Sequence, residues 1–182
     1  ASGRVYLRGV NSVERLFTSS TSSNAWELVG ANISLGGNIN SLLSSANPSS
    51  VILNRSTFAY LFNGNDSITE ASNLILPSLH LIDYCYYSMF YGCTSLTQAP
   101  ALSATSLERY CYQSMFYGCT SLTQAPELPA TILDSNCYQS MFQGCSRLNS
   151  VECLATDISA FDCVSNWLSN VSSSGTFVKA AS

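Results

Sequence analysis

The most reactive side chains in this sequence are eight cysteines, all between residues 85 and 163. Cysteines together with histidine can bind zinc, but zinc needs four ligands that converge tetrahedrally, commonly in closely spaced pairs. None of the spacings here fits that pattern, and the single histidine, His80, lies outside the periodic part of the chain. We therefore expect no metal and no cofactor.

Disulfides are the second chemistry that an even number of cysteines suggests. Two cysteines of one repeat are eight residues apart, about 12 Å along a helix, whereas a disulfide tolerates a Cα separation of roughly 7 Å at most. Three members of a series also cannot all pair with one another. We expect reduced, buried thiols in the two series that recur at one fixed interval, which are Cys85, Cys111 and Cys137, and Cys93, Cys119 and Cys145.

The remaining two cysteines, Cys153 and Cys163, are ten residues apart in a segment without the repeat signature. An irregular terminal segment would gain stability from a covalent link. Their spacing leaves both the disulfide and the free thiols open.

The sequence lacks the combinations of side chains that an enzyme active site requires. His80 lies between two leucines, which is typical of a structural histidine. Glu108 and Asp134 are equivalent positions of successive repeats, so they are expected to line a solvated edge and not to form an acid–base pair. The glycines of "SLGGNIN" lack the lysine of a phosphate-binding loop. The sequence predicts that the protein is not an enzyme.

The segments that carry these residues recur along the sequence as a repeat. "CYYSMFYGCTSLTQAP" at 85–100 returns as "CYQSMFYGCTSLTQAP" at 111–126, with one difference, and a looser copy, "CYQSMFQGCSRLNSVE", begins at residue 137. A weaker first copy begins near residue 59, where Leu61, Phe62, Gly64 and Ile68 align with constant residues of the later copies. In a stacked array each repeat contacts only its neighbours, so apolar positions that recur form ladders through the core. We expect almost full burial of the six repeat cysteines and of Met89, Met115, Met141, Leu96, Leu122 and Leu148.

Each repeat has a helical half and an extended half in this interpretation. Cys111, Met115 and Cys119 follow at i, i+4 and i+8 on one helical face, and Gly118 is a natural helix stop. The following "SLTQAPEL" has the spacing of a short strand that Pro126 ends. This predicts an α/β repeat solenoid with short strands on one side and short helices on the other. Residues 1–58 are expected to form a β-rich N-terminal cap, 59–152 the array, with repeats starting near 59, 85, 111 and 137, and 153–182 an irregular C-terminal cap.

The motif Phe-x-Gly-Cys-Thr-Ser-Leu-Thr, followed by a proline-bearing strand, resembles the BspA-type leucine-rich repeats of bacterial surface proteins, of the Treponema pallidum class. More closely, residues 85–116 are similar to the 26-residue variety of gut Bacteroidales. The resemblance covers residues 59 to about 152, and the flanking segments are also similar to those that accompany such repeats. It implies a leucine-rich repeat solenoid that is extracellular or displayed on the bacterial cell surface, where many members of the family bind ligands or mediate adhesion.

Composition excludes two classes of partner. A net charge of -4 with seven scattered Lys and Arg residues offers no basic surface to nucleic acid. No apolar run approaches the roughly 20 residues that span a bilayer, so we expect no membrane insertion by this segment.

The variable positions of the repeats are the candidate ligand-binding surface. Tyrosine gives a large contact area at low entropic cost, and glutamine adds hydrogen-bonding groups. The sequence thus predicts a non-enzymatic binding or adhesion module whose partner is a protein or glycan on a host or neighbouring cell. The alternatives are a structural or receptor-binding domain of an appendage, a fimbria or a phage tail, and tyrosines that only help the repeats to stack. The predicted site residues are Tyr84, Tyr87, Tyr91, Tyr110, Gln113, Tyr117, Gln139 and Gln143, with the strand face around Thr97, Gln98, Thr123 and Gln124 as a second choice.

Overall fold

The computed structural model describes residues 25–44, 47–48 and 51–180. Its regular elements are strand β1 (Ile33–Asn38), the 3₁₀ helix η2 (Ile39–Leu42), and strands β2 (Ile68–Ile75), β3 (Ser150–Cys153) and β4 (Thr176–Lys179). β1 pairs with β2, and β3 pairs with β4, both in parallel. Residues 1–24 of the predicted N-terminal cap lie outside the described residues.

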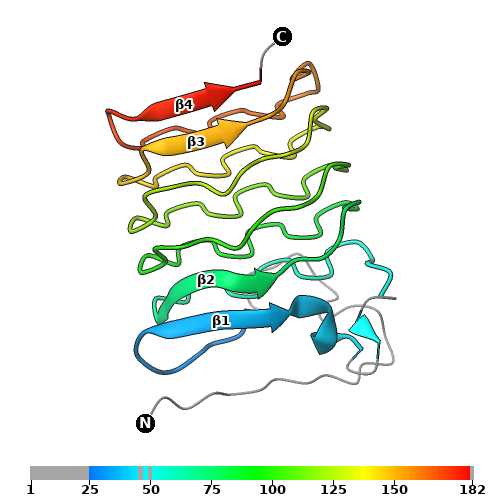
Figure 1. Cartoon of the computed structure of the whole chain (residues 1–182), viewed down its shortest axis with the longest axis vertical. Helices are drawn as coiled ribbons and strands as arrows, with labels where there is room; N and C mark the ends of the chain where they lie inside the picture. The colour runs from blue at the N-terminus through cyan, green and yellow to red at the C-terminus, as the bar shows by residue number, and fades with distance from the viewer. Residues whose placement is uncertain (1–24, 45–46, 49–50, 181–182) are drawn as a thin grey trace.

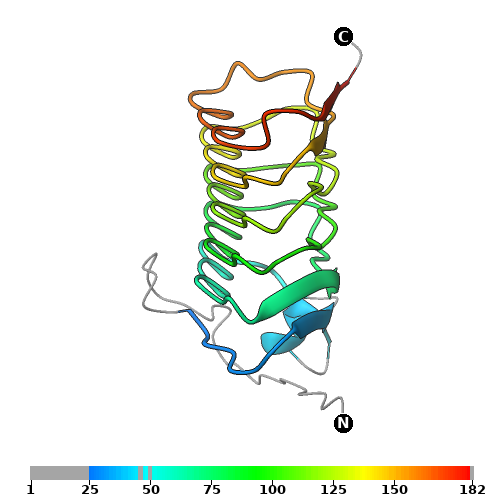
Figure 2. The same cartoon turned by 90° about the vertical axis from the view of Figure 1, so that its left-hand side faces the viewer.

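Between the two strand pairs, the chain forms a stack of coils, each coil being one complete turn of the backbone (Figure 1). Single parallel bridges, such as Glu70 with Gln98 and Gln124 with Ser150, join the extended parts of neighbouring coils. On the opposite side of the stack, each coil makes a tightly wound segment (Figure 2). We call these five segments the turn segments; they span residues 56–65, 84–93, 110–119, 136–145 and 162–171.

The backbone of a turn segment divides its hydrogen bonds between two directions. Met89 N–H donates to the Tyr86 carbonyl within the same coil, at 3.2 Å, whereas Tyr86 N–H donates to the Cys111 carbonyl of the next coil, at 3.0 Å. The alternation continues, since Tyr91 N–H donates to Ser88 in its own coil and Phe90 N–H donates to Met115 in the next. Because each backbone donor must find an acceptor when it is buried, this scheme couples every coil to the following one.

The turn segments are not the short helices that the i, i+4, i+8 spacing predicts. In an α-helix each N–H donates to the carbonyl four residues earlier, so no donor is left for a neighbouring coil. Here Tyr84, Ser88 and Gly92 have positive φ angles of 59°, 50° and 69°. A positive φ at the third position of a turn is the geometry of a type II turn. The left-handed residue recurs every four residues, and the cysteine and methionine spacing of four fits this period as well as it fits a helix.

The predicted ladders of the core are confirmed. Each of the six repeat cysteines, the three methionines and the three leucines exposes at most 1% of its surface. Buried aromatic rings run beside them, because Phe62, Phe90, Phe116 and Phe142 stack at centroid distances of 5.4 to 5.6 Å. Each coil therefore buries its apolar side chains against the same side chains of its neighbours, as expected for a repeat with one contiguous core.

The turn-segment pattern extends beyond the predicted array. Tyr138 N–H donates to Cys163 and Phe142 N–H donates to Trp167, with the same offset that links the earlier coils. Cys163, one repeat interval after Cys137, thus continues the first cysteine ladder into a segment that the sequence assigned to an irregular cap. Within the described residues, no helix is long and apolar enough to cross a membrane.

Candidate functional site

The predicted tyrosines lie on the turn segments and reach the surface. Tyr84, Tyr87, Tyr110 and Tyr117 are partly exposed, and Tyr91 exposes 38% of its surface. Runs of buried residues separate them along the chain: Cys85 and Tyr86 lie between Tyr84 and Tyr87, and Met89 and Phe90 lie before Tyr91. The exposure expected for Tyr87 and Tyr91 is confirmed, although the backbone that positions them is a series of turns.

These tyrosines form rows across neighbouring coils. The rings of Tyr84 and Tyr110 stack with centroids 4.5 Å apart and planes 12° apart. Tyr91 and Tyr117 stack at 4.6 Å with an angle of 4°. Parallel rings at this distance cover each other's facing sides, so between the two rings of a row only edges and hydroxyl groups reach the solvent. We call the two rows, together with Tyr87, the tyrosine surface.

Two residues that the sequence did not predict enlarge the tyrosine surface. Tyr60 packs its ring edge against Tyr87 at a centroid distance of 5.2 Å, and the guanidinium of Arg55 lies 4.8 Å from the centroid of the Tyr84 ring. Burial, and then the neighbouring Tyr87, raise the pKa of Tyr60 above its usual value, so this phenol keeps its proton further into the alkaline range. Both residues belong to the first coil, where the weaker copy of the repeat gave no signal for them.

Amide side chains continue the surface where tyrosines end. The Gln113 side-chain N–H donates to the Gln139 oxygen of the next coil. Asn136, which takes the place of Tyr110 but is buried, donates to the same oxygen at 3.1 Å. For Gln143, which follows Tyr117 in its row, the structure gives no side-chain bond to the other described residues. Apart from Gln143, the predicted site residues are therefore joined to neighbours on the surface, first by rings and then by amides.

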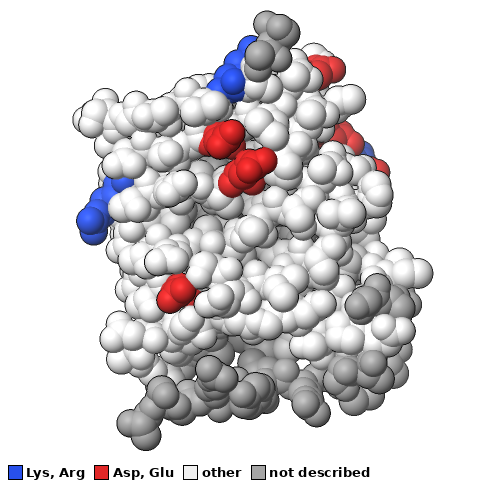
Figure 3. Space-filling model, in the orientation of Figure 1, with Lys and Arg blue, Asp and Glu red and all other residues white. Residues whose placement is uncertain are grey.

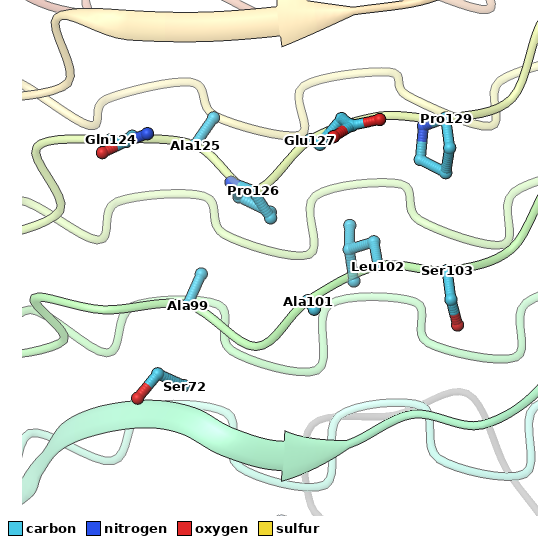
Figure 4. A pocket seen from close by; sticks show the side chains of 10 residues that line it. All are labelled: Ser72, Ala99, Ala101, Leu102, Ser103, Gln124, Ala125, Pro126, Glu127 and Pro129. Atoms are coloured by element: carbon cyan, nitrogen blue, oxygen red, sulfur yellow. The ribbon is translucent and has the colours of Figure 1, made fainter.

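The second binding surface predicted from the sequence lies on the strand side of the stack. An open groove of about 530 Å³ crosses three neighbouring coils and is lined mostly by small and apolar side chains (Figure 4). Of the strand-side residues predicted from the sequence, only Gln124 lines it. Figure 3 shows this side of the molecule as a mostly neutral surface with a few scattered acidic and basic side chains.

The residues that the sequence suggested as catalytic or metal-binding groups do not lie close together in the structure. His80 is exposed and its backbone forms a bridge with Ser106, while the exposed Glu108 and the partly buried Asp134 lie on different coils. The described residues contain no group of three or more side chains that could hold a metal ion. All eight cysteines are buried free thiols, including Cys153 and Cys163, for which the sequence left a disulfide open.

Thiol chemistry is suppressed at these cysteines. Removing a thiolate from water costs free energy, so burial raises the pKa of Cys93, Cys137 and Cys145 to about 12. A nucleophilic cysteine needs a lowered pKa and access to solvent. The cysteine ladders therefore serve packing.

Comparison of the chain with protein-family models, with curated proteins and with solved structures finds no match.

Proposed function

We propose that this protein is a non-enzymatic binding or adhesion module of the bacterial cell surface, built on BspA-type leucine-rich repeats, and that it binds its partner through the tyrosine surface. The observation that carries the proposal is the pair of stacked rows, Tyr84 with Tyr110 and Tyr91 with Tyr117, at 4.5 and 4.6 Å. Side chains held in this way lose little conformational entropy when a partner binds, which is an advantage for an interface.

The chemistry of the exposed groups favours a protein partner over a glycan that stacks on ring faces. The inner faces of the two rows are already covered by the neighbouring tyrosine. Besides one outer face per ring, what remains is a set of hydroxyls, ring edges and amides, together with the cation of Arg55 over Tyr84. Tyrosine and arginine are enriched in protein interfaces, because each combines a large apolar contact with a polar end.

A hydrolase or transferase has no support in the described residues. Burial raises the pKa of each repeat cysteine, and the thiols of one ladder donate to backbone carbonyls. At the groove on the strand side, the Ser72 hydroxyl donates to the Glu70 carboxylate at 2.7 Å, but this pair is exposed to solvent. Binding is thus the activity that the exposed groups can perform.

The test is a binding array of host proteins and glycans probed with the purified protein and with two matched triple variants. The first variant, Tyr87→Ala, Tyr91→Ala and Tyr117→Ala, removes the centre of the tyrosine surface. The second, Thr97→Ala, Gln98→Ala and Thr123→Ala, removes exposed side chains from the strand side. We expect both variants to keep the circular dichroism spectrum of the parent, and only the first to lose its signals on the array.

Two results would contradict the proposal. Retained binding by the tyrosine variant, with loss in the strand-side variant, would place the site on the strand face. An array without any signal for the parent protein would favour a spacer or appendage domain. The glycan and protein halves of the array separately decide the class of partner.

A further inference from the structure

Backbone hydrogen bonds join the strand sides of most neighbouring coils, which we number in chain order by their turn segments. Between the first and second coils, the Ala71 N–H donates to the Gln98 carbonyl at 2.8 Å. Between the third and fourth coils, the equivalent Ala125 N–H donates to the Ser150 carbonyl at 2.9 Å. The same bond thus recurs at equivalent positions of the stack.

Between the second and third coils, the strand-side bonds are missing. Ala99 is the alanine of the second coil that corresponds to Ala71 and Ala125, and its N–H meets no acceptor among the described residues. Neither a bridge nor a backbone hydrogen bond links residues 97–107 to residues 123–133. The other interfaces in the described part of the stack are bridged or paired on this side. The strand side is therefore interrupted in the middle of the array.

The interruption coincides with the groove on the strand side. Ala99 and Ala101 line the groove from the second coil, and Pro126 and Glu127 line it from the third (Figure 4). Because most of the lining side chains are short, they leave the space between the two backbones open to solvent. The groove is thus the surface counterpart of the missing hydrogen bonds.

On the turn side, the same interface is bonded along its whole length. Backbone N–H groups of the second coil donate to carbonyls of the third at distances of 2.7 to 3.1 Å. These donors belong to Tyr84, Tyr86, Ser88, Phe90 and Gly92. An interface that is firmly bonded on one side and unpaired on the other has the geometry of a hinge, with its pivot in the bonded side.

The two tyrosine stacks lie across this same interface. Tyr84 and Tyr91 belong to the second coil, and their partners Tyr110 and Tyr117 belong to the third. If the strand sides separate, the two coils tilt about the turn segments. The rings lie on the outer surface of the turn side, so the tilt presses them together and turns them out of their parallel arrangement. Because offset parallel stacking is favourable, the stacks oppose the tilt.

We propose that the interface between the second and third coils is a flexible joint. Its strand side opens and closes, the turn segments act as the hinge, and the two tyrosine stacks limit the opening. Regions with few backbone hydrogen bonds open locally at a lower free energy than the rest of a protein. Opening widens the groove and exposes core side chains of the second coil, such as Ala104, which is 1% exposed in the closed form. The joint does not depend on whether the tyrosine surface binds a partner.

A thiol placed beside the joint reports its opening in the full chain. Ala104→Cys places the thiol at the joint, and Ala71→Cys, at a fully buried alanine of the paired interface between the first and second coils, is the matched control. Both variants are treated with iodoacetamide under native conditions, and mass spectrometry identifies the labelled residue, since the native thiols are buried. We expect Ala104→Cys to be labelled about tenfold faster or more, at a rate that low urea does not change. Ala71→Cys is expected to follow global unfolding.

Removing the tyrosine stacks should release the joint. In the Ala104→Cys protein, Tyr84→Ala and Tyr91→Ala together are expected to raise the labelling rate by roughly 2- to 12-fold per stack, the factor that matches the usual coupling of an aromatic pair. The same substitutions in the Ala71→Cys protein are expected to leave its rate unchanged relative to global unfolding. Tyr84→Phe with Tyr91→Phe keeps the stacked rings and should keep the slower rate.

Amide hydrogen exchange of the unmodified protein tests the joint without any variant that could fail to fold. We expect the amide of Ala99 to exchange faster than the amides of Ala71 and Ala125, which hold the equivalent positions and donate to the next coil. Equal protection of the three amides would overturn the proposal, as would equal labelling rates of Ala104→Cys and Ala71→Cys. A labelling rate that the alanine variants leave unchanged, or raise equally at both sites, would also overturn it.

Discussion

The thiol of Cys119 donates a hydrogen bond to the carbonyl oxygen of Phe90, one coil earlier, at 3.2 Å. The same carbonyl also accepts from the backbone N–H of Cys93, at 3.1 Å. Cys145 repeats this arrangement with Phe116 at 3.0 Å, and Cys93 with Phe62 at 3.1 Å. The second cysteine ladder therefore ties each coil to the one before it with a side chain, while the backbone donors of the turn segments tie each coil to the one after it.

Cys119→Ala removes this thiol from a fully buried place. We expect a loss of about 1–2 kcal/mol in the free energy of unfolding, because a small cavity remains and one hydrogen bond is lost, while the Phe90 carbonyl keeps its bond from Cys93. Urea denaturation measures the change. Thr123→Ala, at an exposed position next to the core position Leu122, serves as the control and should stay within about 0.5 kcal/mol of the parent.

Alkaline pH is expected to destabilise the protein steeply. The pKa of Cys93, Cys137 and Cys145 is raised to about 12 in the folded state, against about 8.5 in the unfolded chain. The folded state thus holds protons that the unfolded state releases, so the stabilisation is complete below about pH 8.5 and is lost as pH rises toward 12. Each such thiol contributes a slope of up to about 1.4 kcal/mol per pH unit.

The measurement is the urea midpoint between about pH 7 and about pH 11, a range that brackets the unfolded-state pKa of cysteine. A double variant, Cys93→Ala with Cys145→Ala, should lose less stability over this range than the parent, although it starts from a lower value at neutral pH. Equal slopes for the two proteins would show that these thiols do not carry the effect.

Gly118 occupies a left-handed position, with a φ of 70°. A Cβ there would meet only Gly92, at 3.9 Å, so space is available and backbone strain decides the cost. We expect Gly118→Ala to destabilise by about 1–2 kcal/mol. Gly118→Asn should cost less, because Asn170 holds the equivalent position of the last coil with a φ of 59°. If both variants cost the same, the left-handed backbone is not the cause.

The Tyr84–Tyr110 stack should be measurable as a coupling energy. In a double-mutant cycle with Tyr84→Ala and Tyr110→Ala, we expect about 0.5–1.5 kcal/mol, the usual range for aromatic pairs. Tyr84 and Tyr117 belong to different rows, and that pair should be additive within about 0.5 kcal/mol. Thermal or urea unfolding of the single and double variants gives the numbers.

Met115→Asp tests the register of the core. Met115 is fully buried between the methionines of the neighbouring coils, so an unpaired carboxylate there has no partner and no water. Burial of an unpaired charge costs several kcal/mol, and we expect the variant to be unfolded at room temperature. A melting temperature close to that of the parent would mean that Met115 is not in the core.

The ladders could be predicted from the sequence because recurrence at a fixed interval is direct information about contact. Met89, Met115 and Met141 recur at equal spacing, and residues separated by that interval lie in adjacent coils. The helix prediction failed for a physical reason. A spacing of four fits both an α-helix and a series of turns with a left-handed residue every fourth position, and Tyr84 and Ser88 carry no sequence sign of positive φ.

The ends of the stack were harder to predict than its centre. In the last turn segment Cys163 keeps the interval, but Trp167 replaces the methionine of the ladder, and the recurrence that identifies a coil fades. At the other end, the interval from Gly64 to Gly92 is 28 residues, against 26 from Gly92 to Gly118, and this irregularity hid Tyr60 and Arg55. Terminal coils contact a repeat on one side only. On the other side, their side chains meet surroundings that are not another repeat.

The near identity of the second and third copies also bears on how the chain reaches its native state. Tyr86 donates to Cys111, but Cys137, one interval later, offers a carbonyl in the same local sequence. A chain that skips one coil would satisfy most of its local contacts and leave a whole repeat looped out. Such near-degenerate pairings are sources of kinetic traps during folding. The longer first interval and the altered side chains at the ends of the stack break this degeneracy, so they act as markers that fix which coil stacks on which.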